Sequence, residues 1–540
     1  MPLYRGSPKP TVGARTHHPF QYSGEAVLVF VGRAGLLLGV REGTYPGLLL
    51  EAAVLSLSLA LNGASETFGV HALSNTVQGQ PVPNRGAEPA ATEPLWLNLS
   101  ARNGTSVGVP VAGDPMVSAQ PIASVPRSST VATLASVRGM TGANLLAGLS
   151  TLTVADLTAF VQQAPGQVDA LLTAPPAASA VAGLWTELGA AERSALLAAA
   201  PKLVGNLEGV PFRERGRANA RYLTQRLADV SQRLADAPDA LDAPDANDAN
   251  DANDANERTV LTRELTVLLQ VKAALRTPDG APRRSLILLD PTGGGRAAIA
   301  LGNPDTADFV SYLVPGMNYT VEQQIVNWTD TADAVYTEQI DVLRGQAAAG
   351  QALTGKFDAE VAGVATIAWI GYETPHLFNV GGTGLAEAGA DFLEQSALGI
   401  EADRGTRQPF VSVLAHSYGS TVALTALARG TFGVDALVLV GSPGSQVQSV
   451  DSLSVAPGNV YVGSADWDPT VNSAFFGSDP GAASYGAKAL GVSGGHDRVT
   501  GSRLTGSVGH NAYFDRGSES LHNMALIGTG NADLVTDGSE

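Results

Sequence analysis

The sequence predicts an α/β fold in which a mostly parallel, doubly wound sheet follows a helical region. Two observations carry this prediction. From about residue 281 to residue 540, short apolar runs alternate with stretches of helical spacing, whereas residues 126–280 show helical spacing throughout. Alternating strands and helices favour a parallel sheet with right-handed crossovers and helices on both of its faces.

Composition limits the possible functions. The chain has 540 residues, of which 44% are hydrophobic and 16% charged, so it should form packed domains. Its net charge of −18 disfavours binding to nucleic acids or to anionic membrane surfaces. Because the chain has no cysteine, disulfides, thiolate nucleophiles and cysteine-based zinc sites are excluded.

Residues 1–125 are punctuated by Pro, Gly, Asn and Ser, and no function can be assigned to them. Their two apolar stretches, 26–40 and 48–61, contain Arg33 and Glu51 and are shorter than the roughly 20 residues that span a bilayer. We expect buried strands or helices there and no membrane span. The N-terminus lacks the layout of a signal peptide, which favours a cytoplasmic protein and leaves secretion or envelope association open.

The helical region, 126–280, contains a run in which Val181, Leu184, Trp185 and Leu188 share one helix face. Core packing explains that face.

Residues 238–256 include four Asp-Ala-Asn units, and their lack of large apolar residues predicts a disordered, solvated loop. An EF-hand would need a glycine and a closing glutamate that this tract lacks, so calcium binding is not favoured.

The third segment, 281–540, should form the α/β domain. Its first two strands should form a hairpin around the turn Gly293–Gly295. The strands are expected at 286–289, 297–301, 309–314, 365–370, 411–414, 436–440 and 460–462, and the helices at 321–351, 385–398 and 421–428.

Ser417 is the best candidate for a catalytic nucleophile. A nucleophilic serine needs a sharp turn between a strand and a helix, with small residues two positions before and after it. The pattern G-x-S-x-G occurs around Ser106 and Ser493, but both serines lie in glycine-rich stretches without the required strand and helix. Ser417 has both flanking elements, and Ala415 is small enough to replace the first glycine.

A histidine should serve as general base, and in this architecture it follows the acid and the serine along the chain. His496, His510 and His522 satisfy that order. His510 is preferred because it lies in a glycine-preceded loop with aromatic residues that could cover a cleft. His496 is the alternative, and a surface loop is expected for His522.

The acid that orients the histidine should follow the strand 460–462. Asp466 and Asp468 both meet this condition. Asp468 is preferred because it begins an Asp-Pro turn, and Asp466 stays open as the alternative.

Two backbone N–H groups, those of Tyr418 and Met317, are expected to stabilise an oxyanion, since Gly316 would let the backbone approach the serine.

Several ordered segments resemble an actinobacterial α/β-hydrolase family once catalogued as a domain of unknown function. The similarity covers roughly residues 180–530. Membership implies a helical region before an α/β-hydrolase domain, with Ser417, Asp468 and His510 at the triad positions. It implies no particular substrate. The matching segments are 203–211, 217–219, 314–317, 368–372 with Pro375, 415–419, 441–444, 468–469 and 509–513.

The residues therefore favour a serine esterase, one that cleaves a small-molecule ester or related acyl bond through an acyl-serine and needs neither a metal nor an organic cofactor. An acyltransferase or thioesterase could use the same triad. A non-catalytic binding protein with this fold is the alternative from another class. The enzymatic readings require Ser417 and His510 to approach hydrogen-bonding distance, and the non-catalytic reading does not.

Overall fold

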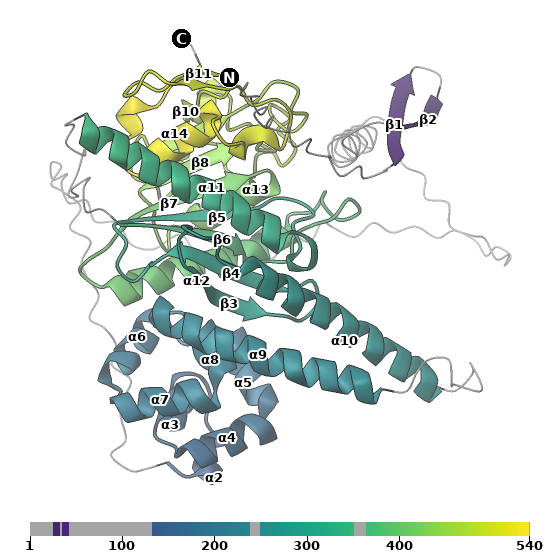
Figure 1. Cartoon of the computed structure of the whole chain (residues 1–540), viewed down its shortest axis with the longest axis vertical. Coiled ribbons are helices and arrows are strands. Elements are labelled where there is room, and N and C mark those ends of the chain that lie inside the picture. Colours follow the sequence, from purple (N-terminus) through teal and green to yellow (C-terminus); the bar gives the residue numbers. More distant parts are fainter. Residues whose placement is uncertain (1–24, 33–34, 43–131, 238–248, 350–362, 539–540) are drawn as a thin grey trace, which may run out of the picture. The chain divides into compact units, whose positions relative to one another are not determined.

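A computed structural model describes residues 25–32, 35–42, 132–237, 249–349 and 363–538, with backbone alone for 25–32, 35–42 and 249–255 (Figure 1). The chain divides into two compact units, one made of residues 1–60 and 123–540 and the other of residues 61–122. The second unit and the apolar stretch 48–61 lie outside the described residues. The first apolar stretch forms the antiparallel hairpin of β1 (Glu25–Gly32) and β2 (Gly35–Glu42).

A sheet of eight strands organises the C-terminal part, in the spatial order β10-β9-β8-β7-β5-β6-β4-β3. From β10 to β6 in this order, every neighbouring pair of strands is parallel. β3 and β4 form an antiparallel hairpin, and β4 pairs with β6 in an antiparallel arrangement. The predicted α/β fold and its first hairpin are confirmed. The strands are β3 (Arg284–Asp290), β4 (Arg296–Gly302), β5 (Phe309–Val314), β6 (Val364–Ile370), β7 (Phe410–His416), β8 (Ala436–Val440), β9 (Val460–Gly463) and β10 (Lys488–Ala489).

Helices cover both faces of this sheet (Figure 1). Every residue of β5, β6 and β8 is buried, because side chains on either face meet a helix. Tyr312 packs in one cluster with a pair of helices, and its neighbour Leu313 packs in a second cluster with three further helices and with Leu223 and Val230 of the helical region. The first pair is α12 (Gly384–Arg404) and α13 (Tyr418–Leu427); the others are α10 (Ala249–Ala274), α11 (Val321–Ala348) and α14 (Glu519–Gly528).

Strand register brings several strand ends to one edge of the sheet, which we call the carboxyl edge. Val314 of β5 pairs with Ala415 of β7, and the next residue of β7, His416, pairs with Val440 of β8. Val440 in turn pairs with Gly463, the last residue of β9. The loops that follow β5, β7, β8 and β9 therefore begin beside one another.

The predicted helical region precedes the sheet. Its apolar side chains form a cluster of their own, which includes Leu149, Phe160 and Trp185. The run Val181 to Leu188 packs in this core, as its spacing predicts. The helices are α2 (Leu134–Val137), α3 (Gly142–Ser150), α4 (Val154–Gln163), α5 (Pro165–Thr173), α6 (Ala178–Glu187), α7 (Ala190–Ala199), α8 (Pro201–Asn206) and α9 (Phe212–Asp236).

Two asparagines join the helical region to β3. The buried Asn219 of α9 donates from Nδ2 to the carbonyl of Gly205 in α8 at 2.7 Å and to that of Leu286 in β3 at 3.2 Å. Asn206 accepts the amide of Leu289 at 2.8 Å. Backbone groups at the edge of the sheet thus bond to side chains of the helical region.

The prediction of a loop over 238–256 is wrong for its second half, since α10 begins at Ala249. Residues 238–248 lie outside the described part of the chain. Helix propagation explains the difference. The packed segment further along α10 nucleates the helix, and alanine extends it at little cost, while aspartates near the N-terminus interact favourably with the helix dipole.

Candidate active site

Ser417 lies on the turn between β7 and α13. Its backbone has φ 55° and ψ −132°, a conformation that L residues rarely adopt, and its amide donates to the carbonyl of Val440 at 3.0 Å. Gly419 is needed two residues later, because a Cβ there would come within 2.5 Å of the Val314 and Pro315 carbonyl oxygens. Ala415 is fully buried.

Three side chains from separate loops form one hydrogen-bonded chain at the carboxyl edge. His510 Nε2 lies 2.8 Å from Ser417 Oγ, and His510 Nδ1 lies 2.9 Å from Asp468 Oδ1. All three side chains are buried. If Nδ1–H donates to the carboxylate, Nε2 is left as an acceptor for the serine hydroxyl, as a general base requires.

Asp468 is surrounded by donors. Tyr513 donates its hydroxyl to Oδ2 at 2.7 Å, and the amide of Thr470 donates to Oδ1 at 2.9 Å. Thr470 Oγ1 also lies 2.6 Å from Oδ1. Burial alone would raise the pKa of Asp468, but hydrogen bonds from His510, Thr470 and Tyr513, with the charge of His510, hold that pKa well below its usual range. The carboxylate is therefore ionised at neutral pH.

The alternative candidates lie elsewhere. The Asp466 side chain is exposed, while its carbonyl accepts the amide of Gly509 at 2.7 Å and so holds the loop that carries His510. His496 is exposed on β11 (Gly495–His496), which pairs with β12 (Arg503–Leu504). The surface loop expected for His522 is wrong. His522 is buried in α14, 2.8 Å from Glu338 Oε1, because this helix packs against α11.

The loop after β5 lies against Ser417. A Cβ on Gly316 would be 2.5 Å from the Ser417 Cβ, so only glycine allows this approach. The next residue, Met317, is buried. Tyr418 is the first residue of α13, and its amide has no carbonyl one turn earlier in the helix to bond. The two N–H groups predicted to bind an oxyanion thus come from segments that flank Ser417.

The sequence reasoning missed His416, which precedes the nucleophile and is buried. Its Nε2 lies 2.8 Å from the carbonyl oxygen of His510, so Nε2 carries a proton. Burial, and next the charge of His510, lower the pKa of His416 to about 3. A histidine at the end of an otherwise apolar strand was the available signal. It was missed because only histidines after Ser417 were considered.

Thr470 and Tyr513 were also not assigned roles from the residues alone. Each lies close in sequence to a predicted triad residue, two positions after Asp468 and three after His510. Polar residues that closely follow a candidate acid or base were therefore the signal to examine. Their contacts with the carboxylate depend on how two loops meet, which local sequence does not specify.

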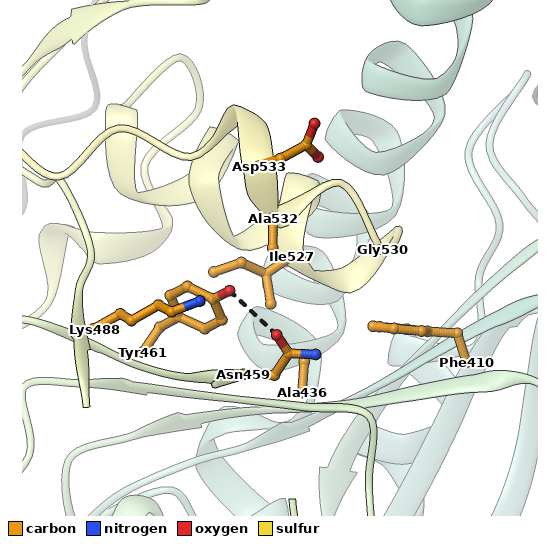
Figure 2. A pocket seen from close by; sticks show the side chains of 9 residues that line it. All are labelled: Phe410, Ala436, Asn459, Tyr461, Lys488, Ile527, Gly530, Ala532 and Asp533. Carbon is orange, nitrogen blue, oxygen red and sulfur yellow. Dashed lines mark hydrogen bonds between the residues drawn. The ribbon is translucent and has the colours of Figure 1, made fainter. Parts of the chain in front are cut away.

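Several cavities lie away from Ser417. One of about 360 Å³ lies at the opposite edge of the sheet, where Phe410 and Ala436 begin β7 and β8 (Figure 2). Figure 2 shows Tyr461 and Lys488 on one side of it and Phe410 on the other. Another, of about 540 Å³, is lined by residues of the helical region and the sheet, among them Lys202 and Trp369.

Two further properties concern the described ranges alone. They contain no group of three or more His, Cys, Asp or Glu side chains placed to hold a metal ion. None of the helices in the described ranges is long and apolar enough to cross a membrane.

A mostly parallel sheet flanked by helices, with a serine on a strained turn after a central strand, defines the α/β-hydrolase class of proteins. Sequence comparison agrees with that class. A family model described as alpha/beta hydrolase matches residues 290–478. The chain belongs to this alpha/beta hydrolase family, as the sequence resemblance implies.

Its relatives include uncharacterized mycobacterial proteins. One from Mycobacterium tuberculosis is 31% identical over 402 residues, which are 66% of this chain and 56% of that protein. One from Mycobacterium bovis is 32% identical over 200 residues, 36% of this chain and 70% of that protein. The chain thus spans about half the length of the Mycobacterium tuberculosis relative.

Similar solved structures include an esterase/lipase from an uncultured bacterium, with a TM-score of 0.28, 10% identity, and coverage of 57% of this chain and 98% of that one. A Pyrobaculum calidifontis esterase has a TM-score of 0.27 and 15% identity, and the match covers 52% of this chain and 94% of that one. Similarity at this level carries no argument about substrate.

Proposed function

We propose that the protein is a serine hydrolase that cleaves an ester or related acyl bond of a small molecule, with Ser417, His510 and Asp468 as its catalytic triad. The observation that carries this proposal is the 2.8 Å separation of Ser417 Oγ and His510 Nε2. It supports catalysis over a binding role for the fold, because a nucleophile must lie within hydrogen-bonding distance of its base.

In the first half-reaction, Ser417 Oγ attacks the carbonyl carbon while His510 Nε2 takes the hydroxyl proton. The tetrahedral intermediate collapses as His510 returns that proton to the departing alcohol oxygen, which leaves an acyl-serine. Asp468 keeps the His510 ring oriented and stabilises its charged form. Water, deprotonated by His510, then attacks the acyl-serine, and His510 gives that proton to Ser417 Oγ as the acid is released.

The developing oxyanion would be held by the amides of Tyr418 and Met317. A fixed N–H donor costs little reorganisation during the reaction and is worth roughly a hundredfold in rate. Gly316 supports this role because its lack of a Cβ lets the loop lie directly against Ser417. The proposed reaction thus uses side chains and backbone N–H groups of this chain.

The test compares Ser417→Ala with Ser493→Ala, measuring hydrolysis of p-nitrophenyl acetate and labelling by a fluorophosphonate probe. Ser493 is the matched control because it lies in a G-x-S-x-G segment and its side chain is exposed. We expect Ser417→Ala to lose both signals and Ser493→Ala to keep both. Turnover and labelling that survive in Ser417→Ala would overturn the proposal.

A further inference from the structure

Two large apolar side chains are exposed on the loops that carry the acid and the base of the proposed triad. Trp467, directly before Asp468, is 89% exposed, and Val508, two residues before His510, is 60% exposed. Large apolar groups with this exposure gain stability only when something covers them. Their position points to an occupant that approaches the carboxyl edge.

The backbone places these two residues on adjacent segments, and we call the pair the apolar rim. Asp466 and Val508 form a parallel bridge, and the amide of Gly509 donates to the Asp466 carbonyl at 2.7 Å. Trp467 follows Asp466 directly, so the two apolar residues lie on adjacent backbone segments. Trp467 also has φ 64°, a strained conformation for a bulky residue.

The chemistry of the proposed reaction decides which part of a substrate meets this rim. The departing alcohol oxygen must receive its proton from His510 Nε2, so the alcohol portion of the ester lies on the His510 side of the reacting carbon. The carbonyl oxygen instead faces the loop after β5. The alcohol portion therefore passes over the loops of His510 and Asp468, where the apolar rim lies.

Charge limits the occupant further. The exposed carboxylate of Asp466 lies beside the rim, and the chain carries a net charge of −18. An anionic group would be repelled there, whereas a neutral alkyl chain would remove Trp467 and Val508 from water without an electrostatic cost.

We propose that the substrate is an ester of a long, uncharged alkyl alcohol whose chain lies on Trp467 and Val508. This inference rests on the proposed hydrolase function and specifies its leaving group. Each methylene that leaves water on the rim should raise kcat/KM by about two- to fourfold, until the rim is covered.

The experiment measures kcat/KM for ethyl, butyl, hexyl and octyl acetate, each below its solubility limit, by acid release at constant pH. All four esters give the same acetyl-enzyme, so differences in kcat/KM arise before that intermediate. We expect kcat/KM to rise along the series. In Trp467→Asn and Val508→Ser the ratio for octyl over ethyl acetate should fall at least tenfold. Asparagine is chosen for position 467 because it tolerates positive φ.

Phe378 supplies the matched control. It is 91% exposed, but it follows β6, and β6 and β9 lie on opposite sides of β7 in the sheet. Phe378→Ser should keep the octyl-to-ethyl ratio. A flat series in the unchanged protein, with p-nitrophenyl acetate still turned over through Ser417, would overturn this inference alone. A lack of any turnover that depends on Ser417 would overturn the proposed function as well.

Discussion

At the scale of single residues, His416 connects the turn of Ser417 to the loop of His510. Its Nε2–H group donates to the carbonyl of His510, and the two imidazole rings lie 4.7 Å apart between centroids. Its other ring nitrogen, Nδ1, is buried without a hydrogen-bond partner. A proton there would place a second charge beside His510, and so the environment keeps His416 neutral.

This neutrality predicts a pH dependence of stability. The pKa of His416 is about 3 in the folded protein and about 6.5 in the unfolded chain. Below the unfolded value the unfolded state binds a proton that the folded state does not. The free energy of unfolding should therefore fall by up to about 1.4 kcal/mol for each pH unit lost toward the folded value.

His416→Gln should remove this contribution and leave a shallower pH dependence, measured by urea denaturation at about pH 7 and about pH 5. The control is His496→Gln, because the His496 side chain is exposed. If His416→Gln loses stability on acidification as steeply as the unchanged protein, His416 is not the residue that resists protonation.

At the scale of elements, the register between β5 and β7 brings together the loops that follow these two strands. Val314 pairs with Ala415, and two residues further along each chain Gly316 comes against Ser417. Sequence spacing predicted both strands. The approach of Gly316 also depends on the parallel pairing of β5 with β7, two strands separated in sequence by α11, β6 and α12.

This contact predicts that Gly316→Ala impairs catalysis without unfolding the protein. A Cβ at residue 316 would lie 2.5 Å from the Ser417 Cβ, so the loop must withdraw and carry the amide of Met317 with it. Loss of one oxyanion donor lowers kcat by roughly a hundredfold or more. We expect a loss of this size in hydrolysis of p-nitrophenyl acetate.

Gly294→Ala is the matched control, since a Cβ on Gly294 would meet nothing within 4 Å. It should keep full activity. Thermal unfolding of both variants separates a catalytic effect from a folding defect. Normal kcat in Gly316→Ala would mean that the loop after β5 does not supply the second oxyanion donor.

At the scale of the whole molecule, the helical region is bonded to the sheet through buried polar groups. Asn219 reaches both Gly205 and Leu286, and Arg215 forms a buried ion pair with Glu208 in the segment between α8 and α9. Burial raises the pKa of Glu208, which the charge of Arg215 partly offsets. Asn219 and Arg215 are buried, whereas the Glu208 side chain keeps 13% of its surface exposed.

Asn219→Ala should therefore destabilise the protein by about 1 to 3 kcal/mol, because two carbonyl groups lose a buried donor. The measurement is the free energy of unfolding from urea denaturation. Asn327→Ala is the control, since Asn327 is exposed on α11 and its amide bonds only at the surface. Equal stability of the two variants would show that Asn219 does not hold this interface.

The sequence by itself determined the fold class and the strands β3 to β9, because apolar periodicity is local and each buried strand needs helices on both of its faces. It also singled out Ser417, because the strand before it, the helix after it and the small residues Ala415 and Gly419 can all be recognised in the neighbouring sequence. It did not predict β10 or α14. The same local reasoning was wrong for 249–256, where a helix packed further along the chain extends through a polar tract.

Only the tertiary structure decided which acid and which histidine meet Ser417. Asp466 and Asp468 are two residues apart, and the sequence preferred Asp468 for its Asp-Pro turn while leaving Asp466 open. In the structure, Asp468 is buried beside His510 and Asp466 is exposed. His510 lies 93 residues after Ser417. The path of the intervening loops, tied by backbone hydrogen bonds such as that from Gly509 to Asp466, brings these side chains together, and no local pattern encodes such a path.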